Sequence, residues 1–172
     1  MALFNNPKKT VYAVTAFVIV FIAALAFNKC HAANLGPTDA PFIQFDAGST
    51  IIRGITPIVG LTFAEPASVL PHSYWQESLN LIGSSKFGNI NAPNNMILSG
   101  LFVPGFGRFD LGLGVSWMAN YYPYNGQNVN FTLQAAYRFV KLPITLTYRH
   151  YSDAGMTAKN IGRDTVLIGW RF

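Results

Sequence analysis

Apolar and polar residues alternate along most of the chain after residue 41, in stretches of about ten residues separated by turn-forming residues. In 108–119 the large apolar side chains occupy every second position, and Asp, Gly and Ser stand between them. The stretch 128–139 repeats the pattern. This period of two predicts β-strands that each have one apolar and one polar face. We count eight such stretches: 42–53, 55–64, 74–84, 95–104, 108–119, 128–139, 143–152 and 164–172.

The segments between these predicted strands are of two lengths. Gly54, 104–107 and 141–142 are short, whereas 65–73, 85–94, 121–127 and 153–163 are longer. Short turns at one end and longer loops at the other are typical of outer-membrane barrels. The fit to strict alternation is imperfect, because we expect the long segment 85–94 to lie on the short-turn side. Pro57 predicts a strand end or a bulge in the second strand.

Composition indicates which way the apolar faces point. Charged residues make up 11% of the chain, hydrophobic residues 51% and aromatic residues 15%, whereas soluble domains carry about 25% charge. The positions opposite the bulky apolar faces include Asp46, Glu77, Asp110, Gln134, Arg138, Arg149 and Arg171. Such a set suits a polar barrel interior and leaves the apolar faces to lipid. We therefore predict an all-β fold, an eight-stranded antiparallel transmembrane β-barrel, over the soluble lipocalin-like barrel that would turn its apolar face inward.

The N-terminal residues 1–33 have the pattern of a cleavable signal peptide. A lysine-containing start precedes an uncharged run, 11–27, and small alanine residues follow it. A retained membrane anchor is the alternative, but this run of 17 residues is at the short limit of about 17–25 for a spanning helix. We predict export, removal of 1–33, and a mature barrel domain of 34–172 in the cell outer membrane.

Charge and cysteine content exclude several other functions. Three of the twelve basic residues lie in the signal segment, which leaves nine basic against seven acidic residues, a net charge of +2. There is no basic patch for a nucleic-acid partner. The single cysteine, Cys30, leaves with the signal peptide. His72, in a predicted loop, is expected to be exposed, and we predict neither a metal nor another cofactor.

Three polar side chains interrupt the apolar faces of the last two predicted strands. His150 and Ser152 lie on the apolar face of the seventh predicted strand, and Asp164 begins the apolar face of the eighth. Because the seventh strand runs outward and the eighth returns, we expect all three at the external rim, facing lipid. A serine nucleophile, a histidine base and an acid that orients the histidine are the minimum for acyl transfer. The alternative is structural: a rim histidine, a turn sequence after Ser152 and an acid that opens a strand.

A family resemblance favours catalysis. The run His150-Tyr151-Ser152-Asp153-Ala154-Gly155, followed by Asn160-Ile161-Gly162-Arg163-Asp164, resembles the motif of the PagL family of outer-membrane lipid A 3-O-deacylases. That motif is His-x-Ser-Asn-x-Gly followed shortly by Asn-x-Gly-x-Glu. The detailed match covers only the end of the chain, and the remainder agrees in architecture. The resemblance implies Ser152 as nucleophile, His150 as base and Asp164 as the acidic member.

Two residues depart from that motif. Asp164 replaces a glutamate, which is mild because either carboxylate can orient a histidine. Asp153 replaces an asparagine. If the asparagine amide donates to the oxyanion, Asp153 cannot, and the backbone N–H of Gly155 remains. Loss of one oxyanion donor costs about 10²–10³ in rate, so we expect weak activity or a rearranged oxyanion hole.

The sequence therefore predicts a serine esterase that hydrolyses the ester-linked 3-position acyl chain of lipid A. Its substrate, lipid A or lipopolysaccharide, would arrive from the outer leaflet, with phosphates near Lys159 or Arg163. The alternatives are a non-enzymatic barrel that serves adhesion or envelope structure, and an outer-membrane phospholipase.

Overall fold

The computed structural model describes residues 40–52, 54–120, 127–154 and 162–172. The predicted signal peptide with Cys30 lies outside the described residues, as do Gly155 and Lys159 of the candidate site. Among the residues that are described, no helix is long and apolar enough to cross a membrane.

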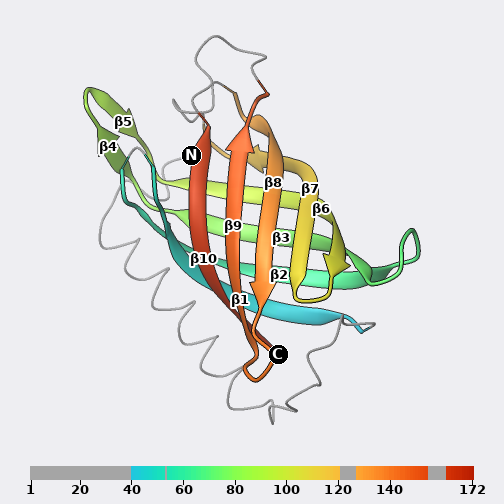
Figure 1. Ribbon diagram of the computed structural model, residues 1–172. Coiled ribbons are helices and arrows are strands. Elements are labelled where there is room, and N and C mark those ends of the chain that lie inside the picture. The colour runs from blue at the N-terminus through green and yellow to red at the C-terminus, as the bar shows by residue number, and fades with distance from the viewer. Residues whose placement is uncertain (1–39, 53, 121–126, 155–161) are drawn as a thin grey trace. The chain divides into compact units, whose positions relative to one another are not determined.

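Eight strands form a closed antiparallel barrel in the order β1-β10-β9-β8-β7-β6-β3-β2 (Figure 1). They are β1 (Phe42–Thr50), β2 (Pro57–Ala67), β3 (Ser73–Ile82), β6 (Asn95–Phe106), β7 (Phe109–Met118), β8 (Val129–Arg138), β9 (Ile144–Ser152) and β10 (Arg163–Arg171). Each overlaps one predicted segment, which confirms the predicted fold. Pro57 begins β2, where its missing N–H removes no hydrogen bond from the strand interior.

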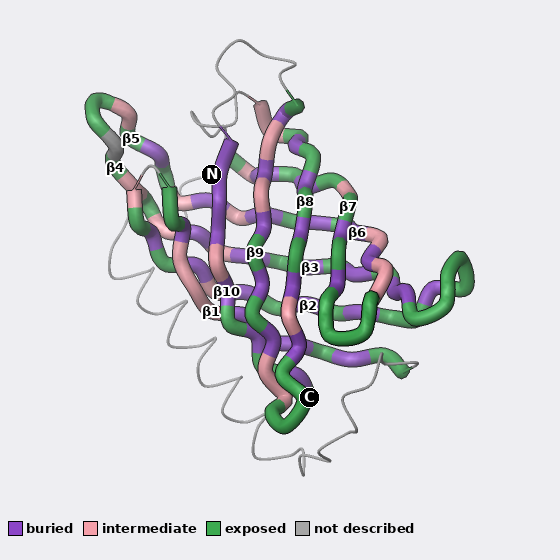
Figure 2. The backbone as a smooth tube through the Cα atoms, in the orientation of Figure 1, coloured by how far each residue is buried: buried purple, intermediate pink, exposed green. Residues whose placement is uncertain are grey.

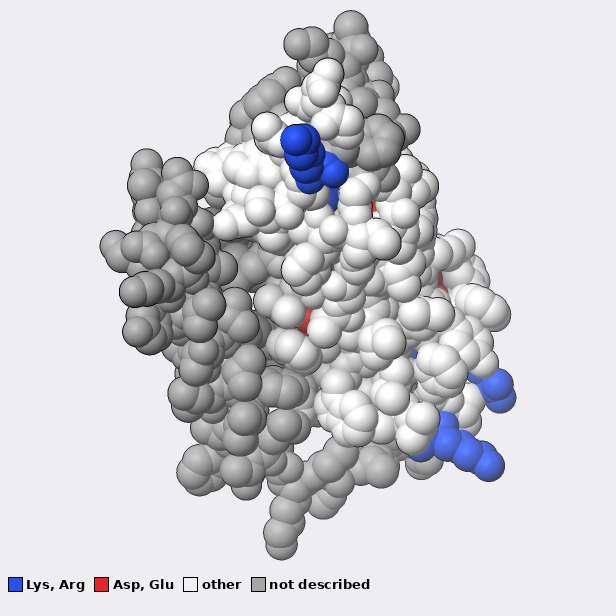
Figure 3. Space-filling view, turned by 90° about the vertical axis from the view of Figure 1, so that its left-hand side faces the viewer, with Lys and Arg blue, Asp and Glu red and all other residues white. Residues whose placement is uncertain are grey.

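Burial alternates along the strands, as Figure 2 shows. On β7, Leu111, Leu113 and Val115 are exposed, whereas Asp110, Gly112 and Ser116 are buried. The outer wall is thus apolar, and the soluble lipocalin-like arrangement is wrong. Figure 3 shows a broad surface on which uncharged residues predominate, with Lys and Arg side chains toward its ends. This distribution is typical of a barrel wall that contacts lipid.

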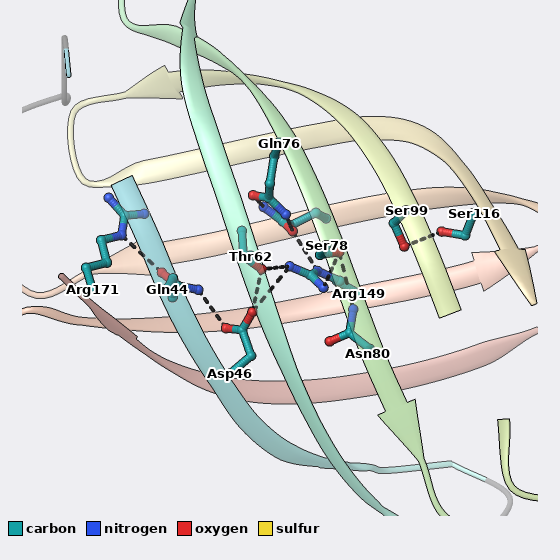
Figure 4. A network of polar contacts seen from close by, with 11 residues as sticks. Gln44, Asp46, Thr62, Gln76, Ser78, Asn80, Ser99, Ser116, Arg149 and Arg171 are labelled. Atoms are coloured by element: carbon teal, nitrogen blue, oxygen red, sulfur yellow. Dashed lines mark hydrogen bonds and ion pairs between the residues drawn. The ribbon is translucent and has the colours of Figure 1, made fainter. Parts of the chain in front are cut away.

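The barrel interior is a hydrogen-bonded polar core (Figure 4). Asp46 accepts hydrogen bonds from Gln44 Nε2 and Thr62 Oγ1, each at 2.6 Å. Arg149 Nη2 lies 3.9 Å from Asp46 Oδ2, and Arg149 Nε donates to Gln134 Oε1 at 2.7 Å. These contacts join β1, β2, β8 and β9 across the lumen. They also supply the ionic or hydrogen-bonding partners that buried charges need.

A second interior cluster lies near the C-terminal end of β10. Arg138 Nε and Arg171 Nη2 lie 3.1 and 3.5 Å from the same Asp110 oxygen. The Arg171 guanidinium also lies 4.2 Å from the centre of the Phe42 ring. All the residues that we predicted to face the interior are therefore buried, except one.

Glu77 is that exception, and its predicted inward orientation is wrong. It is exposed on β3 beside Trp75 and Leu79, whereas Gln76 and Ser78 are buried. The uncharged polar residues of β3 already occupy the interior positions, so the alternation leaves Glu77 on the outer wall. It pairs in register with Phe63 and with Gly100.

The long segment 85–94 also lies elsewhere than expected. It contains a hairpin of β4 (Ser85–Phe87) and β5 (Ile90–Ala92). Arg163 at the start of β10 donates from Nη2 to Ser85 Oγ at 3.3 Å, which places the hairpin at the end where β9 stops and β10 starts (Figure 1). Strand direction alternates strictly, so this loop belongs with the long loops. The connection that we predicted at 65–73 is shorter than expected, because β2 extends to Ala67 and β3 begins at Ser73, which leaves only 68–72 between the two strands.

Candidate active site

The antiparallel pairing of β9 and β10 brings His150 and Asp164 directly opposite each other. His150 Nδ1 lies 2.9 Å from Asp164 Oδ1, at hydrogen-bond distance. The imidazole side chain is 31% exposed and the carboxylate 9%. Directly paired residues of an antiparallel sheet have Cβ atoms about 5 Å apart, so the register alone accounts for this contact. The carboxylate is thereby shielded, while part of the imidazole stays exposed.

Ser152 ends β9 on the same face as His150, two positions further along the strand. Its Oγ accepts a hydrogen bond from the Ala154 backbone N–H at 3.1 Å. Ala154 has a φ of 56°, a left-handed conformation unusual for a residue with a Cβ. The chain thus turns immediately after Ser152, and the serine lies partly exposed at the rim of the outer wall.

Gly162 closes the other side of the histidine. It has a φ of 68°, and a Cβ at this position would lie 2.6 Å from His150 Cε1 and 3.2 Å from Nε2. The glycine backbone therefore packs against the Cε1–Nε2 edge of the imidazole. We assigned Gly162 no role from the sequence, although it belongs to the Asn-x-Gly-x-acid run.

Tyr148 also contacts the acidic residue, which sequence reasoning missed. Its hydroxyl donates to Asp164 Oδ1, the same oxygen that lies against His150 Nδ1. Tyr148 lies two positions before His150, on the same face and diagonal to Asp164. The signal available in the sequence was this spacing, since diagonal neighbours in a sheet are within reach of aromatic side chains.

The interior core fixes the backbone from which these side chains extend. Arg149, between Tyr148 and His150, is fully buried and held by Asp46 and Gln134. Its carbonyl accepts a hydrogen bond from Thr165 Oγ1 at 3.3 Å, next to Asp164 on β10. Groups on strands with packed supports are held more precisely than groups on loops.

The other residues that we singled out from the sequence differ in how far they are buried. Asp153 is fully buried, in contrast with the partly exposed Ser152. Arg163 is also buried and reaches Ser85, so it is not the rim cation that we expected near lipid phosphates. His72 is exposed, as predicted. Within the described ranges, no three His, Cys, Asp or Glu side chains are grouped so as to hold a metal ion.

The closed barrel and its apolar wall define an outer-membrane β-barrel. On this wall a serine shares a strand face with a hydrogen-bonded His–Asp pair, and these are residue types that nucleophilic ester hydrolysis can use. Comparison with protein families gives a match over residues 66–172 to PagL, lipid A 3-O-deacylase. This covers more than half of the chain, so the chain belongs to the PagL family. It is therefore an acyl ester hydrolase of the outer membrane, in a family that acts on lipid A.

A solved structure supports the fold. The crystal structure of the outer membrane enzyme PagL superposes with a TM-score of 0.53 at 17% sequence identity, covering 77% of this chain and 99% of that chain. No curated protein sequence matches the chain.

Proposed function

We propose that this protein hydrolyses the ester-linked acyl chain at the 3-position of lipid A, with Ser152 as nucleophile, His150 as general base and Asp164 as the group that orients His150. The observation that carries the proposal is the hydrogen-bond contact between His150 Nδ1 and Asp164 Oδ1, beside Ser152 on the outer wall. The proposal is supported by the family to which the chain belongs, which is described as lipid A 3-O-deacylase.

The reaction proceeds in two acyl-transfer steps. Ser152 Oγ attacks the ester carbonyl while His150 Nε2 takes the serine proton. The tetrahedral intermediate collapses, and His150 returns that proton to the leaving alcohol of the glucosamine. Water then attacks the acyl-serine by the same route, which releases the fatty acid and restores Ser152. Throughout, Asp164 stays ionised and holds the proton on Nδ1, so that Nε2 is the free base.

The position of the site fits a substrate that lies in a membrane. Arg149 and its partners fill the lumen with side chains, whereas His150 and Ser152 face the outer wall. A lipid in the outer leaflet reaches this wall by lateral diffusion, and its acyl chains lie against the exposed apolar side chains of neighbouring strands. No part of the substrate needs to leave the membrane.

The oxyanion hole remains a prediction, with Asp153 and Gly155 as its candidates. A carboxylate at Asp153 accepts hydrogen bonds but cannot donate one to an oxyanion. We therefore propose that the Gly155 backbone N–H supplies the donor and that the aspartate limits the rate. We further propose that residues 1–33 direct export and are removed from the 34–172 barrel.

Mass spectrometry of lipid A from cells that express the protein tests this function. Wild-type protein should remove one hydroxyacyl chain from the 3-position, and Ser152→Ala should leave lipid A intact. Ser68→Ala, an exposed serine in the turn after β2, is the matched control and should behave as wild type. Unchanged deacylation by Ser152→Ala would refute the assignment. Release of fatty acid from glycerophospholipids instead would favour a phospholipase, and no lipid change would favour a structural barrel.

A further inference from the structure

The hydroxyl of Tyr148 occupies a position that the Ser-His-acid mechanism does not use. It donates to Asp164 Oδ1, and the same oxygen lies 2.9 Å from His150 Nδ1. Tyr148 and His150 both extend from β9, two positions apart, and Asp164 faces them from β10. One carboxylate oxygen is therefore held between two groups of the neighbouring strand.

Tyr148 differs in its surroundings from a buried structural tyrosine. Its side chain is 39% exposed on the outer wall, where the acyl chains of surrounding lipid offer no hydrogen-bonding group to a phenol or a carboxylate. A carboxylate can rotate about its side-chain bonds, and hydrogen bonds restrict that of Asp164 to an orientation that presents an oxygen to Nδ1. The phenol supplies a second hydrogen bond, and its ring is held by a strand.

We propose that Tyr148 is a positioning residue that holds the Asp164 carboxylate in the orientation that His150 requires, so that the working group is Tyr148–Asp164–His150–Ser152. This inference rests on the proposed function and adds to it a residue that acts on the acid. Tyr148 lies four positions before Ser152 on β9, and its hydroxyl contacts Asp164. Its effect on the reaction passes entirely through Asp164.

The variant Tyr148→Phe keeps the ring against lipid and removes only the hydroxyl. We expect kcat for lipid A deacylation to fall about 10-fold, which corresponds to about 1.4 kcal/mol, with KM unchanged because the ring surface is retained. The rate at which a serine-directed phosphonate labels Ser152 should fall by a similar factor. Tyr137→Phe is the matched control, because its hydroxyl accepts from Arg108 Nη1 at 3.4 Å, on another strand pair; both its rates should equal wild type.

A double-mutant cycle distinguishes positioning from any other role. In an Asp164→Ala background the phenol has no carboxylate to hold, so adding Tyr148→Phe should lower neither the deacylation rate nor the labelling rate any further. The proposal would be overturned if Tyr148→Phe lowered these rates by the same factor in the wild-type and Asp164→Ala backgrounds. It would also be overturned if the single variant changed only KM, or had wild-type rates. Heat-dependent electrophoretic mobility confirms that each variant folds.

Failure of this inference is separable from failure of the proposed function. If Ser152→Ala abolishes deacylation and Asp164→Ala slows it while Tyr148→Phe keeps the wild-type rate, the triad stands and only the role of Tyr148 is lost. If Ser152→Ala retains deacylation, the proposed function itself is lost, and a change in Tyr148→Phe no longer bears on it.

Discussion

Replacing Gly162 by alanine tests whether the position of the histidine ring limits the reaction. A Cβ at this position lies 2.6 Å from His150 Cε1 and 3.2 Å from Nε2, whereas carbon atoms in contact are normally about 3.5–4.0 Å apart. The overlap with Cε1 is thus on the order of 1 Å. Since Nδ1, which is bonded to Cε1, is held by Asp164, the ring must tilt or shift, and Nε2 leaves the position from which the proposed mechanism needs it to act on Ser152.

Two effects of this substitution have different magnitudes. Alanine at a φ of 68° costs about 1–2 kcal/mol of folding free energy. A displacement of about 1 Å in a catalytic group costs about 10²-fold in rate. We therefore expect Gly162→Ala to lower kcat about 100-fold while the barrel remains folded, because the conformational cost is small relative to the stability of a closed barrel.

Gly107→Ala provides the control for backbone strain. Gly107 has a φ of 63° in the turn between β6 and β7, and a Cβ there meets no atom within 4 Å. This variant has the same backbone cost without the steric overlap, so its stability should fall as in Gly162→Ala while its turnover stays at the wild-type rate. The assay is release of fatty acid from lipid A in detergent micelles, with unfolding followed in parallel. Wild-type turnover in a folded Gly162→Ala variant would refute the reasoning.

Three further substitutions test other parts of the account. Asp153→Asn should raise ester turnover, by up to about 10²-fold if its amide supplies an oxyanion donor; equal rates would remove Asp153 from the oxyanion hole. Asp46→Ala should destabilise the barrel by about 3–5 kcal/mol in urea unfolding, because Arg149 loses its buried counter-charge, and a loss below about 1 kcal/mol would contradict the importance of that pair. Glu77→Leu should stabilise the barrel in lipid vesicles, by less than the about 2–4 kcal/mol that a lipid-facing Arg or Lys costs; unchanged stability would mean that Glu77 does not contact the apolar part of the bilayer.

The alternation of side chains was sufficient to predict the barrel. In β7 and β8 apolar residues fall on every second position without interruption, and a narrow eight-stranded barrel can place only small and hydrogen-bonded polar groups inside. The prediction that Glu77 faces the interior was wrong because we assigned its orientation by its charge instead of by its position in the alternation. Its neighbours on β3 already showed the parity, with Trp75 and Leu79 on one face and Gln76 and Ser78 on the other.

The site was predictable where it depends on strand register and not where it depends on side-chain rotamers. Parity placed His150, Ser152 and Asp164 on one wall, and antiparallel pairing set His150 opposite Asp164. The roles of Tyr148 and Gly162 depend on where a phenol hydroxyl points and how closely a backbone approaches a ring. Spacing along the chain does not determine either quantity, so both required the three-dimensional structure.

The most direct test of the central claim is to locate a serine-directed phosphonate on the folded protein in lipid vesicles by peptide mass spectrometry. We predict a single adduct on Ser152, formed much more slowly in His150→Ala and Asp164→Ala. Deacylation of lipid A by a protein that gives no adduct on Ser152, or an adduct on a different serine that abolishes activity, would contradict a reactive trio on the outer wall.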